Sequence, residues 1–234
     1  MTSKNAIPSH RAGLLIPSSY TVLEKELMSN APGGWSFHSA RMFLEDSSIL
    51  SLARMLDEFA NIAARDLASM EPDLVVFSSM SAAALRGNEA EDALIRNLES
   101  ILHVPVISPM KATRQMLKSM ELDHLVVITP YVNGINQQIK ACFENDGFRV
   151  MRIEGFNLTR CRDMAELSPE HIMQIARKIA KDTQPEALVI CGSNVPLLNQ
   201  LKSMQASMPC LVVTTNKVIL EEIVRIGYKL SKPH

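Results

Sequence analysis

The chain repeats one pattern along most of its length: a short apolar run is followed by a stretch whose apolar residues recur at helical spacing. Apolar runs of four or five residues that end at proline, glycine or serine are typical of buried strands. Strands that alternate with helices predict a mainly parallel sheet, because parallel neighbours need a crossover connection that is usually helical. The sequence therefore predicts an α/β fold.

The same pattern gives the expected elements. Strands are expected at residues 13–16, 35–42, 73–77, 104–107, 124–128, 148–153, 188–191 and 210–213. Helices are expected at residues 21–28, 47–68, 88–101, 109–120, 133–146, 168–181 and 216–226, with a short one beginning at Pro196. Residues 154–166 are mixed and polar, and we expect them to form a loop.

The chain is also internally doubled. Residues 71–79 are echoed by residues 184–192, and residues 104–110 are echoed by residues 208–214, with a helix expected after each segment. Repeats at this distance predict two similar α/β lobes. Two such lobes that face each other would bring Ser78 or Ser79 and Cys191 to opposite walls of one cleft.

Charge and composition argue against several classes of partner. The 234 residues include 24 basic and 25 acidic ones, without a cluster of lysines or arginines, so we expect no nucleic-acid surface. The apolar runs are too short to cross a bilayer, and residues 1–11 lack the apolar core of a signal peptide. The four cysteines have no zinc spacing, and no glycine-rich nucleotide motif follows a strand. We therefore expect a cytoplasmic protein with reduced thiols, without a zinc site and without a bound nucleotide. The sequence does not fix the oligomeric state, and a homo-oligomer stays an open alternative.

Five expected strand ends carry turns that are rich in hydroxyl and amide side chains, and all five precede expected helices. Helix N-termini offer free N–H donors and favour anions. None of the turns contains a lysine, arginine or histidine, so donors of this kind suit a small carboxylate better than a polyphosphate. The alternative is that these side chains only cap helices. The turns lie at residues 17–19, 78–81, 129–131, 191–194 and 214–216.

Cys191 ends one of these strands and is the strongest candidate for chemistry. With Ser193 or Asn194 as the N-cap, a helix with Pro196 in its first turn would place its positive end near the thiol. That placement lowers the pKa of a thiol and favours the thiolate. The alternative is a buried core cysteine, because cysteine is among the most buried residue types. Cys142 and Cys210 are expected in the core, and Cys161 in the polar loop.

Several short segments, taken in order, resemble the aspartate/glutamate racemase superfamily in its maleate isomerase and arylmalonate decarboxylase branch. The resemblance extends from about Arg11 to Gly227. It implies two pseudo-symmetric Rossmann-like (flavodoxin-like) lobes, at residues 1–115 with 215–234 and at residues 116–214, with the active site between them and no cofactor or metal. The segments that carry it are residues 16–24, 37–42, 79–81, 128–132 and 191–193.

The resemblance also implies the site residues. Racemases and maleate isomerases of this superfamily carry one catalytic cysteine in each lobe. The second corresponds to Cys191 and the first to Ser79, although the internal repeat alone would favour Ser78. Ser81 and Gly192 correspond to donors to a carboxylate. Substrate contacts are expected from Pro17, Ser18, Tyr20, Ser78, Met80, Ser81, Tyr131, Gly192 and Ser193.

Two departures from the family pattern affect the expected activity. Tyr20 stands where maleate isomerases have an asparagine, and Ser79 stands where they have a cysteine. A hydroxyl has a pKa far above the ~8.5 of a thiol, so Ser79 cannot replace a thiolate base without a partner. Arylmalonate decarboxylase likewise keeps only the second cysteine. We therefore expect a cysteine enzyme that isomerises or decarboxylates a small mono- or dicarboxylate, with Cys191 as acid/base or nucleophile; the alternative is a lapsed member that only binds a carboxylate.

Overall fold

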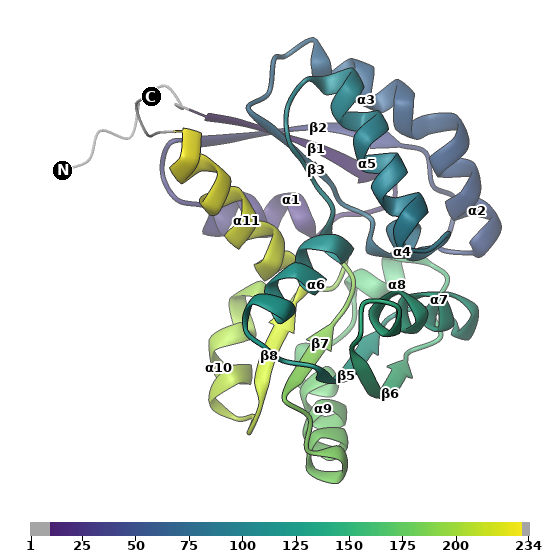
Figure 1. Cartoon of the computed structure of the whole chain (residues 1–234), viewed down its shortest axis with the longest axis vertical. Coiled ribbons are helices and arrows are strands. Elements are labelled where there is room, and N and C mark those ends of the chain that lie inside the picture. Colours follow the sequence, from purple (N-terminus) through teal and green to yellow (C-terminus); the bar gives the residue numbers. More distant parts are fainter. Residues whose placement is uncertain (1–9, 231–234) are drawn as a thin grey trace.

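Two parallel four-stranded sheets organise the chain, one above the other in Figure 1. The computed structural model describes residues 10–230, so the expectations for residues 1–9 and 231–234 lie outside it. The first sheet has the strand order β2-β1-β3-β4 and the second the order β6-β5-β7-β8. Because the two orders match position by position, the structure confirms two α/β lobes of the same topology.

The apolar runs form the strands as expected. The central strands β3 and β7 are buried along their whole length, which agrees with parallel strands that are covered on both faces. Register between neighbours is regular, with Leu14 beside Val76 in the first sheet and Val127 beside Val189 in the second. The strands are β1 (His10–Pro17), β2 (Trp35–Met42), β3 (Leu74–Phe77), β4 (Val106–Ile107), β5 (His124–Thr129), β6 (Arg149–Gly155), β7 (Ala187–Ile190) and β8 (Leu211–Thr214).

Most helices also lie where their spacing places them, with ends shifted by a few residues. The long helix expected over residues 47–68 is interrupted by a π-helical turn, η1. Two short helices, α4 and α8, were not expected, and α8 makes the prediction of a loop over residues 154–166 wrong in part. The helices are α1 (Leu23–Asn30), α2 (Ile49–Arg54), η1 (Met55–Phe59), α3 (Ala60–Ala68), α4 (Met80–Ala84), α5 (Asn88–Leu102), α6 (Pro109–Ser119), α7 (Asn133–Glu144), α8 (Cys161–Ala165), α9 (Pro169–Thr183), the 3-10 turn η2 (Leu198–Gln200), α10 (Leu201–Ala206) and α11 (Thr215–Leu230).

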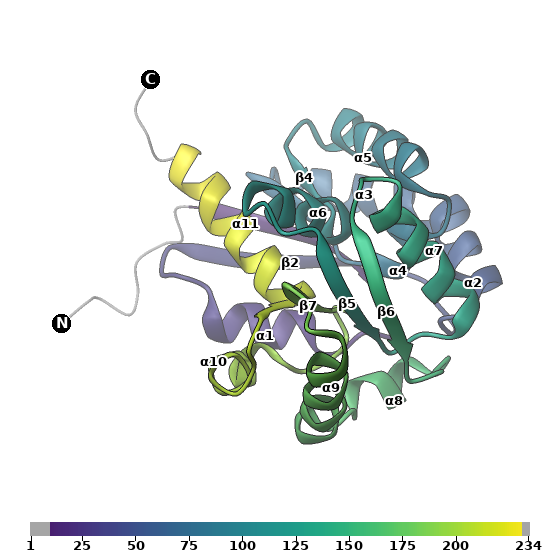
Figure 2. The ribbon, with the colours of Figure 1, turned by 60° about the horizontal axis from the view of Figure 1, so that its bottom comes forward.

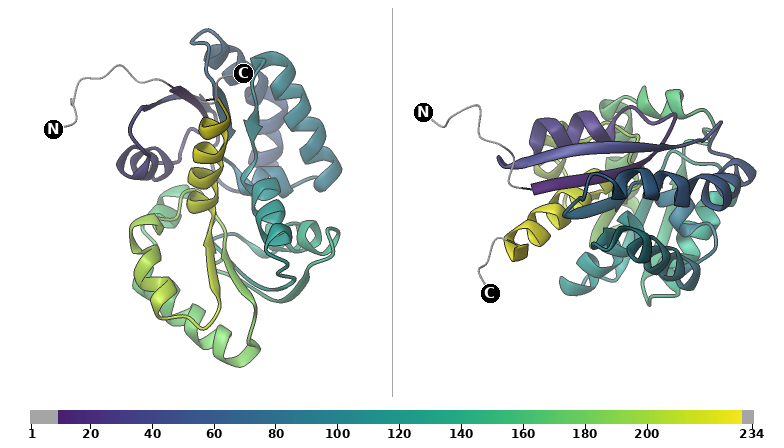
Figure 3. Two further views of the ribbon diagram at one scale, coloured as in Figure 1. Left: turned by 60° about the vertical axis from the view of Figure 1, so that its left-hand side comes forward. Right: turned by 90° about the horizontal axis from the view of Figure 1, so that it is seen from above.

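The chain passes between the sheets twice, from α6 into β5 and from β8 into α11. Helices α6 and α11 pack against each other beside these crossings (Figure 2). Helix α11 begins at the end of β8 and runs alongside the first sheet, where it also contacts α1 and β3 (Figure 3). The lobe boundaries implied by the resemblance stay a prediction. No helix within residues 10–230 is long and apolar enough to cross a membrane.

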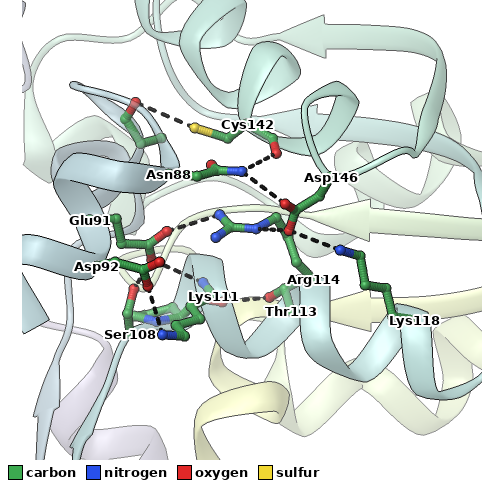
Figure 4. Close-up of polar contacts among 12 residues, drawn as sticks. Asn88, Glu91, Asp92, Ser108, Lys111, Thr113, Arg114, Lys118, Cys142 and Asp146 are labelled. Carbon is green, nitrogen blue, oxygen red and sulfur yellow. Dashed lines mark hydrogen bonds and ion pairs between the residues drawn. The ribbon is translucent and has the colours of Figure 1, made fainter.

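A buried polar network joins the two halves of the chain at α5, α6 and α7 (Figure 4). Arg114 in α6 donates to Glu91 in α5 at 2.9 Å and to Asp146 after α7 at 2.8 Å. The side chain of Glu91 is fully buried and that of Arg114 is 5% exposed. Asn88 adds hydrogen bonds to the carbonyl of Cys142 at 3.0 Å and to Asp146 at 3.2 Å. The network therefore fixes α7 of the second half against α5 and α6 of the first.

Candidate functional site

The segment after β3 and the turn after β7 meet at the junction of the two lobes. The hydroxyl of Ser193 donates to the carbonyl of Ser78. The hydroxyl of Thr215 accepts from the N–H of Gly192 at 2.9 Å and lies 3.5 Å from the sulfur of Met80. The structure therefore brings together the two segments in which the catalytic residues were predicted.

Local geometry explains how each segment reaches the junction. Ser78 continues β3 and donates to the carbonyl of Leu15 through both its N–H, at 3.0 Å, and its hydroxyl, at 2.8 Å. Ser79 is the N-cap of α4, and its hydroxyl accepts from the N–H of Ala82 at 3.4 Å. On the other side, Gly192 has a φ of 116°, a conformation that side chains rarely adopt. This glycine turns the chain directly after Cys191.

Further contacts close the junction between the lobes. The side chain of Asn194 accepts from the N–H groups of Thr21 at 2.8 Å and Val22 at 3.2 Å, just before α1. The same side chain donates to the carbonyl of Cys161 at 2.7 Å. Glu26 in α1 accepts from the N–H of Leu198 at 2.9 Å. These bonds join residues far apart in the sequence, and no local pattern indicated them.

Cys191 lies inside this closed junction, with no exposed surface. Burial raises the pKa of its thiol well above the usual value, so the thiol is neutral. The predicted thiolate at a helix N-terminus is therefore wrong for this structure. The short helix expected from Pro196 begins later, as the 3-10 turn at Leu198 that continues into α10, so no helix starts directly after the turn that follows Cys191. Asn194, a candidate N-cap, instead bonds across the junction.

Two buried phenols face the same region. The hydroxyl of Tyr131 lies near Tyr20, Cys191 and Ser81. The hydroxyl of Tyr20 lies near Ser81, Tyr131 and Ser79. None of these approaches has hydrogen-bond geometry, so neither phenol has a partner among residues 10–230. Burial raises the pKa of Tyr20 to about 12 and raises that of Tyr131 well above its ordinary value, so both remain neutral donors.

Unsatisfied buried hydroxyls gather at strand ends. Besides the two phenols, the hydroxyls of Ser19 and Thr214 lack a partner within the described residues. The four follow or end β1, β5 and β8. Buried polar atoms in folded proteins are nearly always hydrogen-bonded, so these exceptions make the carboxyl ends of the strands the candidate position for a ligand.

The structure separates the predicted substrate contacts into two kinds. The hydroxyl of Ser18 bonds the backbone of Leu44, and the carbonyl of Pro17 accepts from the N–H of Tyr20. With the bonds described above, the polar groups of Ser18, Ser78 and Ser193 and the N–H of Gly192 already have partners within the protein. Met80 is fully buried. The groups that retain donors for a ligand are Cys191, Ser79, Ser81, Tyr20 and Tyr131, of which Ser79 and Ser81 contact each other at 3.4 Å.

Sequence reasoning placed Cys161 in a polar loop, which the structure corrects. It is the first residue of α8, it is 3% exposed, and its sulfur lies 3.4 Å from the hydroxyl of Ser47. It also lies near the hydroxyl of Tyr20. Cys142 and Cys210 are buried, as expected. Thr215, which contacts both Gly192 and Met80, lies in the hydroxyl-rich turn predicted at residues 214–216, but it was not predicted as a site residue.

Charge around the site is low. Among residues 10–230, Arg114 is the only buried lysine, arginine or histidine, and its partners are Glu91 and Asp146. An anion at the junction would therefore be held by neutral donors. One group of possible metal ligands in the described chain consists of Asp123, His124 and Glu186, with atoms within 4.8 Å of one another. It lies at the start of β5 and just before β7, at the opposite end of the second sheet from Cys191.

Comparisons with known proteins agree with this architecture. The sequence is 23% identical over 197 residues to maleate isomerase of Nocardia farcinica (strain IFM 10152), covering 80% of this chain and 78% of that protein. The fold is similar to that of Nocardia farcinica maleate cis-trans isomerase in a cysteine-to-serine variant with a covalently bound succinylcysteine intermediate (TM-score 0.87, 22% identity, 94% of this chain and 93% of that chain). It is also similar to a double variant of arylmalonate decarboxylase in the liganded form (TM-score 0.86, 13% identity, 96% of this chain and 95% of that chain).

The relatives named here are all enzymes, and at these identities the structural likenesses show the shared fold. Residues 12–228 match the family model described as arylmalonate decarboxylase. The match spans almost the whole described chain and confirms the resemblance found in the sequence. The chain belongs to the arylmalonate decarboxylase family.

Proposed function

We propose that this protein is a cofactor-independent enzyme that decarboxylates a small dicarboxylate, with Cys191 as the proton donor. The observation that carries the proposal is the neutral, buried thiol of Cys191 next to the unpartnered hydroxyl of Tyr131. A neutral thiol is a proton donor rather than a base or a nucleophile. The residue that the family resemblance places in the first lobe as its counterpart is an alcohol, Ser79.

The proposed step balances as follows. The bond between the α-carbon and one carboxylate breaks, carbon dioxide leaves, and the electron pair passes into an enediolate formed with the retained carboxylate. The S–H of Cys191 then gives its proton to the α-carbon, and the resulting thiolate takes a proton from water before the next cycle. Tyr131 and Ser81 donate to the enediolate oxygens, and such preorganised donors stabilise charge that develops in a transition state.

The surroundings of Ser79 support a single acid. Its hydroxyl contacts the hydroxyl of Ser81 and the N–H of Ala82, and neither is a base. An alcohol without a base does not ionise near neutral pH. A mechanism that uses two thiols, one in each lobe, is therefore not supported for this chain.

A second candidate is cis-trans isomerisation of a maleate-like substrate. It is favoured by the maleate isomerase relatives and by the succinylcysteine intermediate of one of them. Cys191 would then have to act as the nucleophile, which its raised pKa opposes. A third candidate is a family member that only binds a carboxylate, which the replacements at Ser79 and Tyr20 favour. A cytoplasmic location, the absence of nucleic-acid partners and a homo-oligomer stay predictions from the sequence.

The test is a substrate screen with matched cysteine variants. Arylmalonates, maleate, aspartate and glutamate are offered to the wild type, to Cys191→Ala and to Cys210→Ala. Cys210 is a suitable control because it is a buried cysteine just before β8, whereas Cys191 follows β7, at the other end of the same parallel sheet.

We expect release of carbon dioxide from an arylmalonate by the wild type and Cys210→Ala, and none by Cys191→Ala. Conversion of maleate to fumarate would support the second candidate instead. Thermal stabilisation by these carboxylates without turnover would support the third. Equal turnover by the wild type and Cys191→Ala would refute a role for the thiol.

A further inference from the structure

A buried carboxylate that the proposed chemistry does not use lies where α1 meets the segment after β7. Within residues 10–230, the buried acidic side chains are those of Glu91, which pairs with Arg114, and Glu26, which is 5% exposed. Glu26 is held by neutral donors: its Oε1 accepts from the N–H of Leu198 at 2.9 Å and its Oε2 from the side-chain amide of Asn216 at 2.7 Å. A buried carboxylate without a cation is costly, so a charge at this position needs a reason beyond packing.

The carboxylate of Glu26 fixes the orientation of the Asn216 amide. The Nδ2 of Asn216 donates both to Glu26 and, at 3.3 Å, to the carbonyl of Ser193. The Oδ1 of the same amide has no hydrogen-bond partner within the described chain, and the residue is 2% exposed. In the reversed orientation, Oδ1 would lie against two acceptors, a carboxylate and a carbonyl. The negative charge of Glu26 therefore favours the orientation in which Asn216 donates to Ser193.

Asn216 is one of two consecutive residues that hold the turn after Cys191. The N–H of Gly192 donates to the hydroxyl of Thr215 at 2.9 Å, and the carbonyl of Ser193 accepts from Asn216. Thr215 and Asn216 are the first two residues of α11, so the start of this helix bonds the turn at two adjacent points. Because Cys191 directly precedes this turn, a shift of the turn moves the thiol.

The charged groups on the elements around Glu26 are directed elsewhere. The 3-10 turn η2, which contains Leu198, carries no charged residue. The charged or titratable side chains of α1, β2 and the first half of α11 are exposed or paired with one another: Lys25, His38, Glu24 with Arg41, and Lys217 with Glu221. Burial is therefore the main influence on Glu26, and it raises the pKa of this carboxyl above the ordinary value.

Loss of the charge of Glu26 would release the amide of Asn216. A protonated carboxyl, like the amide of a glutamine, is a donor as well as an acceptor. After a half-turn of its amide, Asn216 can accept from this donor through Oδ1, the atom that otherwise has no partner among residues 10–230. Nδ2 then points away from the carbonyl of Ser193. The two charge states of Glu26 thus correspond to two arrangements of Asn216, only one of which holds the turn.

We propose that Glu26 is a positioning residue for Cys191: its negative charge orients the amide of Asn216, which holds the carbonyl of Ser193 and with it the turn that carries the thiol. The inference rests on the proposed function in that it assumes Cys191 to be the reacting group. The accessibility of this thiol can nevertheless be measured without turnover, so the two proposals can fail separately.

The test compares Glu26→Gln, which removes the charge at nearly constant size, with Glu24→Gln as the matched control. Glu24 lies on the same helix but pairs with Arg41 of β2. The double variant Glu26→Gln/Asn216→Asp restores a hydrogen bond between the two side chains, with glutamine as the donor, but leaves the carbonyl of Ser193 without one. For each protein we measure the melting temperature, the rate at which a thiol reagent modifies Cys191, and kcat and KM for an arylmalonate.

In Glu26→Gln we expect modification of Cys191 to become about three- to tenfold faster and kcat to fall by a similar factor, as for the loss of one hydrogen bond that holds the turn. KM should change less than about twofold, because Glu26 does not touch the substrate, and Glu24→Gln should match the wild type in every measurement. The double variant should regain the melting temperature of the wild type and keep the fast modification of Cys191.

A pH profile of the wild type tests the same inference without any variant. Cys191 and Cys210 are modified together, and the ratio of their rates is followed from about pH 8 to about pH 4. Burial raises the pKa of both thiols, so their thiolate fractions fall in parallel over this range and cancel in the ratio. As Glu26 takes up its proton, the ratio should rise in favour of Cys191. In Glu26→Gln the ratio should be high throughout and independent of pH.

Equal modification of Cys191 in Glu26→Gln and the wild type, or a ratio that stays constant with pH in the wild type, would overturn the inference. A double variant in which both the melting temperature and the modification rate return to wild-type values would also overturn it, because Glu26 would then only tie α1 to α11. Charge-dependent modification without turnover by the wild type would refute the decarboxylase and leave the role of Glu26 intact. Turnover that requires Cys191 but is unchanged in Glu26→Gln would do the reverse.

Discussion

Replacing Asn194 by alanine should both destabilise the fold and open the site. The side chain is 1% exposed and makes three hydrogen bonds: two cross the junction to the N–H groups of Thr21 and Val22, and one holds the carbonyl of Cys161 in the second half of the chain. Alanine leaves all three backbone groups without their partner. Each buried unsatisfied group costs about 1–3 kcal/mol, so a loss of about 3 kcal/mol is a conservative sum when water enters the space.

This loss is measurable by urea unfolding followed by circular dichroism. For a chain of this size, about 3 kcal/mol corresponds to a fall of roughly 6–12 °C in melting temperature. Asn97→Ala is the matched control, because Asn97 makes an exposed hydrogen bond to Asn61. The control should stay within about 0.5 kcal/mol of the wild type, as surface substitutions usually do.

The same substitution should change the chemistry of Cys191, since Asn194 holds the turn that carries it against the first lobe. A thiol reagent should modify Cys191 faster in Asn194→Ala than in the wild type, as mass spectrometry of that peptide would show. A stability within about 0.5 kcal/mol of the wild type, or an unchanged rate of modification, would refute the view that this side chain closes the junction.

Three further outcomes follow from buried groups. Arg114→Met should cost about 3–5 kcal/mol in urea unfolding, because it strands the carboxylate of Glu91, whereas Arg86→Met, which removes an exposed pair, should cost less than about 1 kcal/mol. The pKa of Tyr20 is raised to about 12 in the folded chain, above its unfolded value of ~10. The stability that this phenol contributes should therefore be lost as pH rises from about 10 to 12. In Tyr20→Phe, the free energy of unfolding should fall less over this pH range. Modification of Cys191 at pH 8 should be slower in the folded chain than in urea by on the order of 100-fold, since the thiol reacts only after local opening, and faster labelling would contradict the closed junction.

Periodicity predicted the architecture well because it depends on burial, which the apolar pattern records directly. The runs at residues 74–77 and 187–190 became the fully buried central strands, and their internal echo became two sheets with the same strand order. The π-helical turn over Met55–Phe59 was not predictable in this way, since one widened turn hardly changes the apolar spacing of a long helix. Helix α4 was missed because its five residues are too few to show a period.

The meeting of the segments after β3 and β7 was predictable, but the chemical state of Cys191 was not. Motif order brought Ser79, Tyr131 and Cys191 into one hypothesis, and the structure places their segments at one junction. The neutral state of Cys191 depends on contacts such as that between Asn194 and Thr21, whose sequence separation is 173 residues. The local sequence predicted a helix N-terminus beside Cys191, but the residues directly after Gly192 form a turn. The unsatisfied hydroxyl of Tyr20 is likewise a product of tertiary packing.

Proton delivery by Cys191 is tested most directly by running the reaction in deuterium oxide on a prochiral arylmalonate. One thiol on one wall of a closed site predicts a product with a single deuterium at the α-carbon and a single configuration, and no product with Cys191→Ala. A racemic product, or the same labelled product from Cys191→Ala, would contradict the assignment of this sulfur as the proton donor.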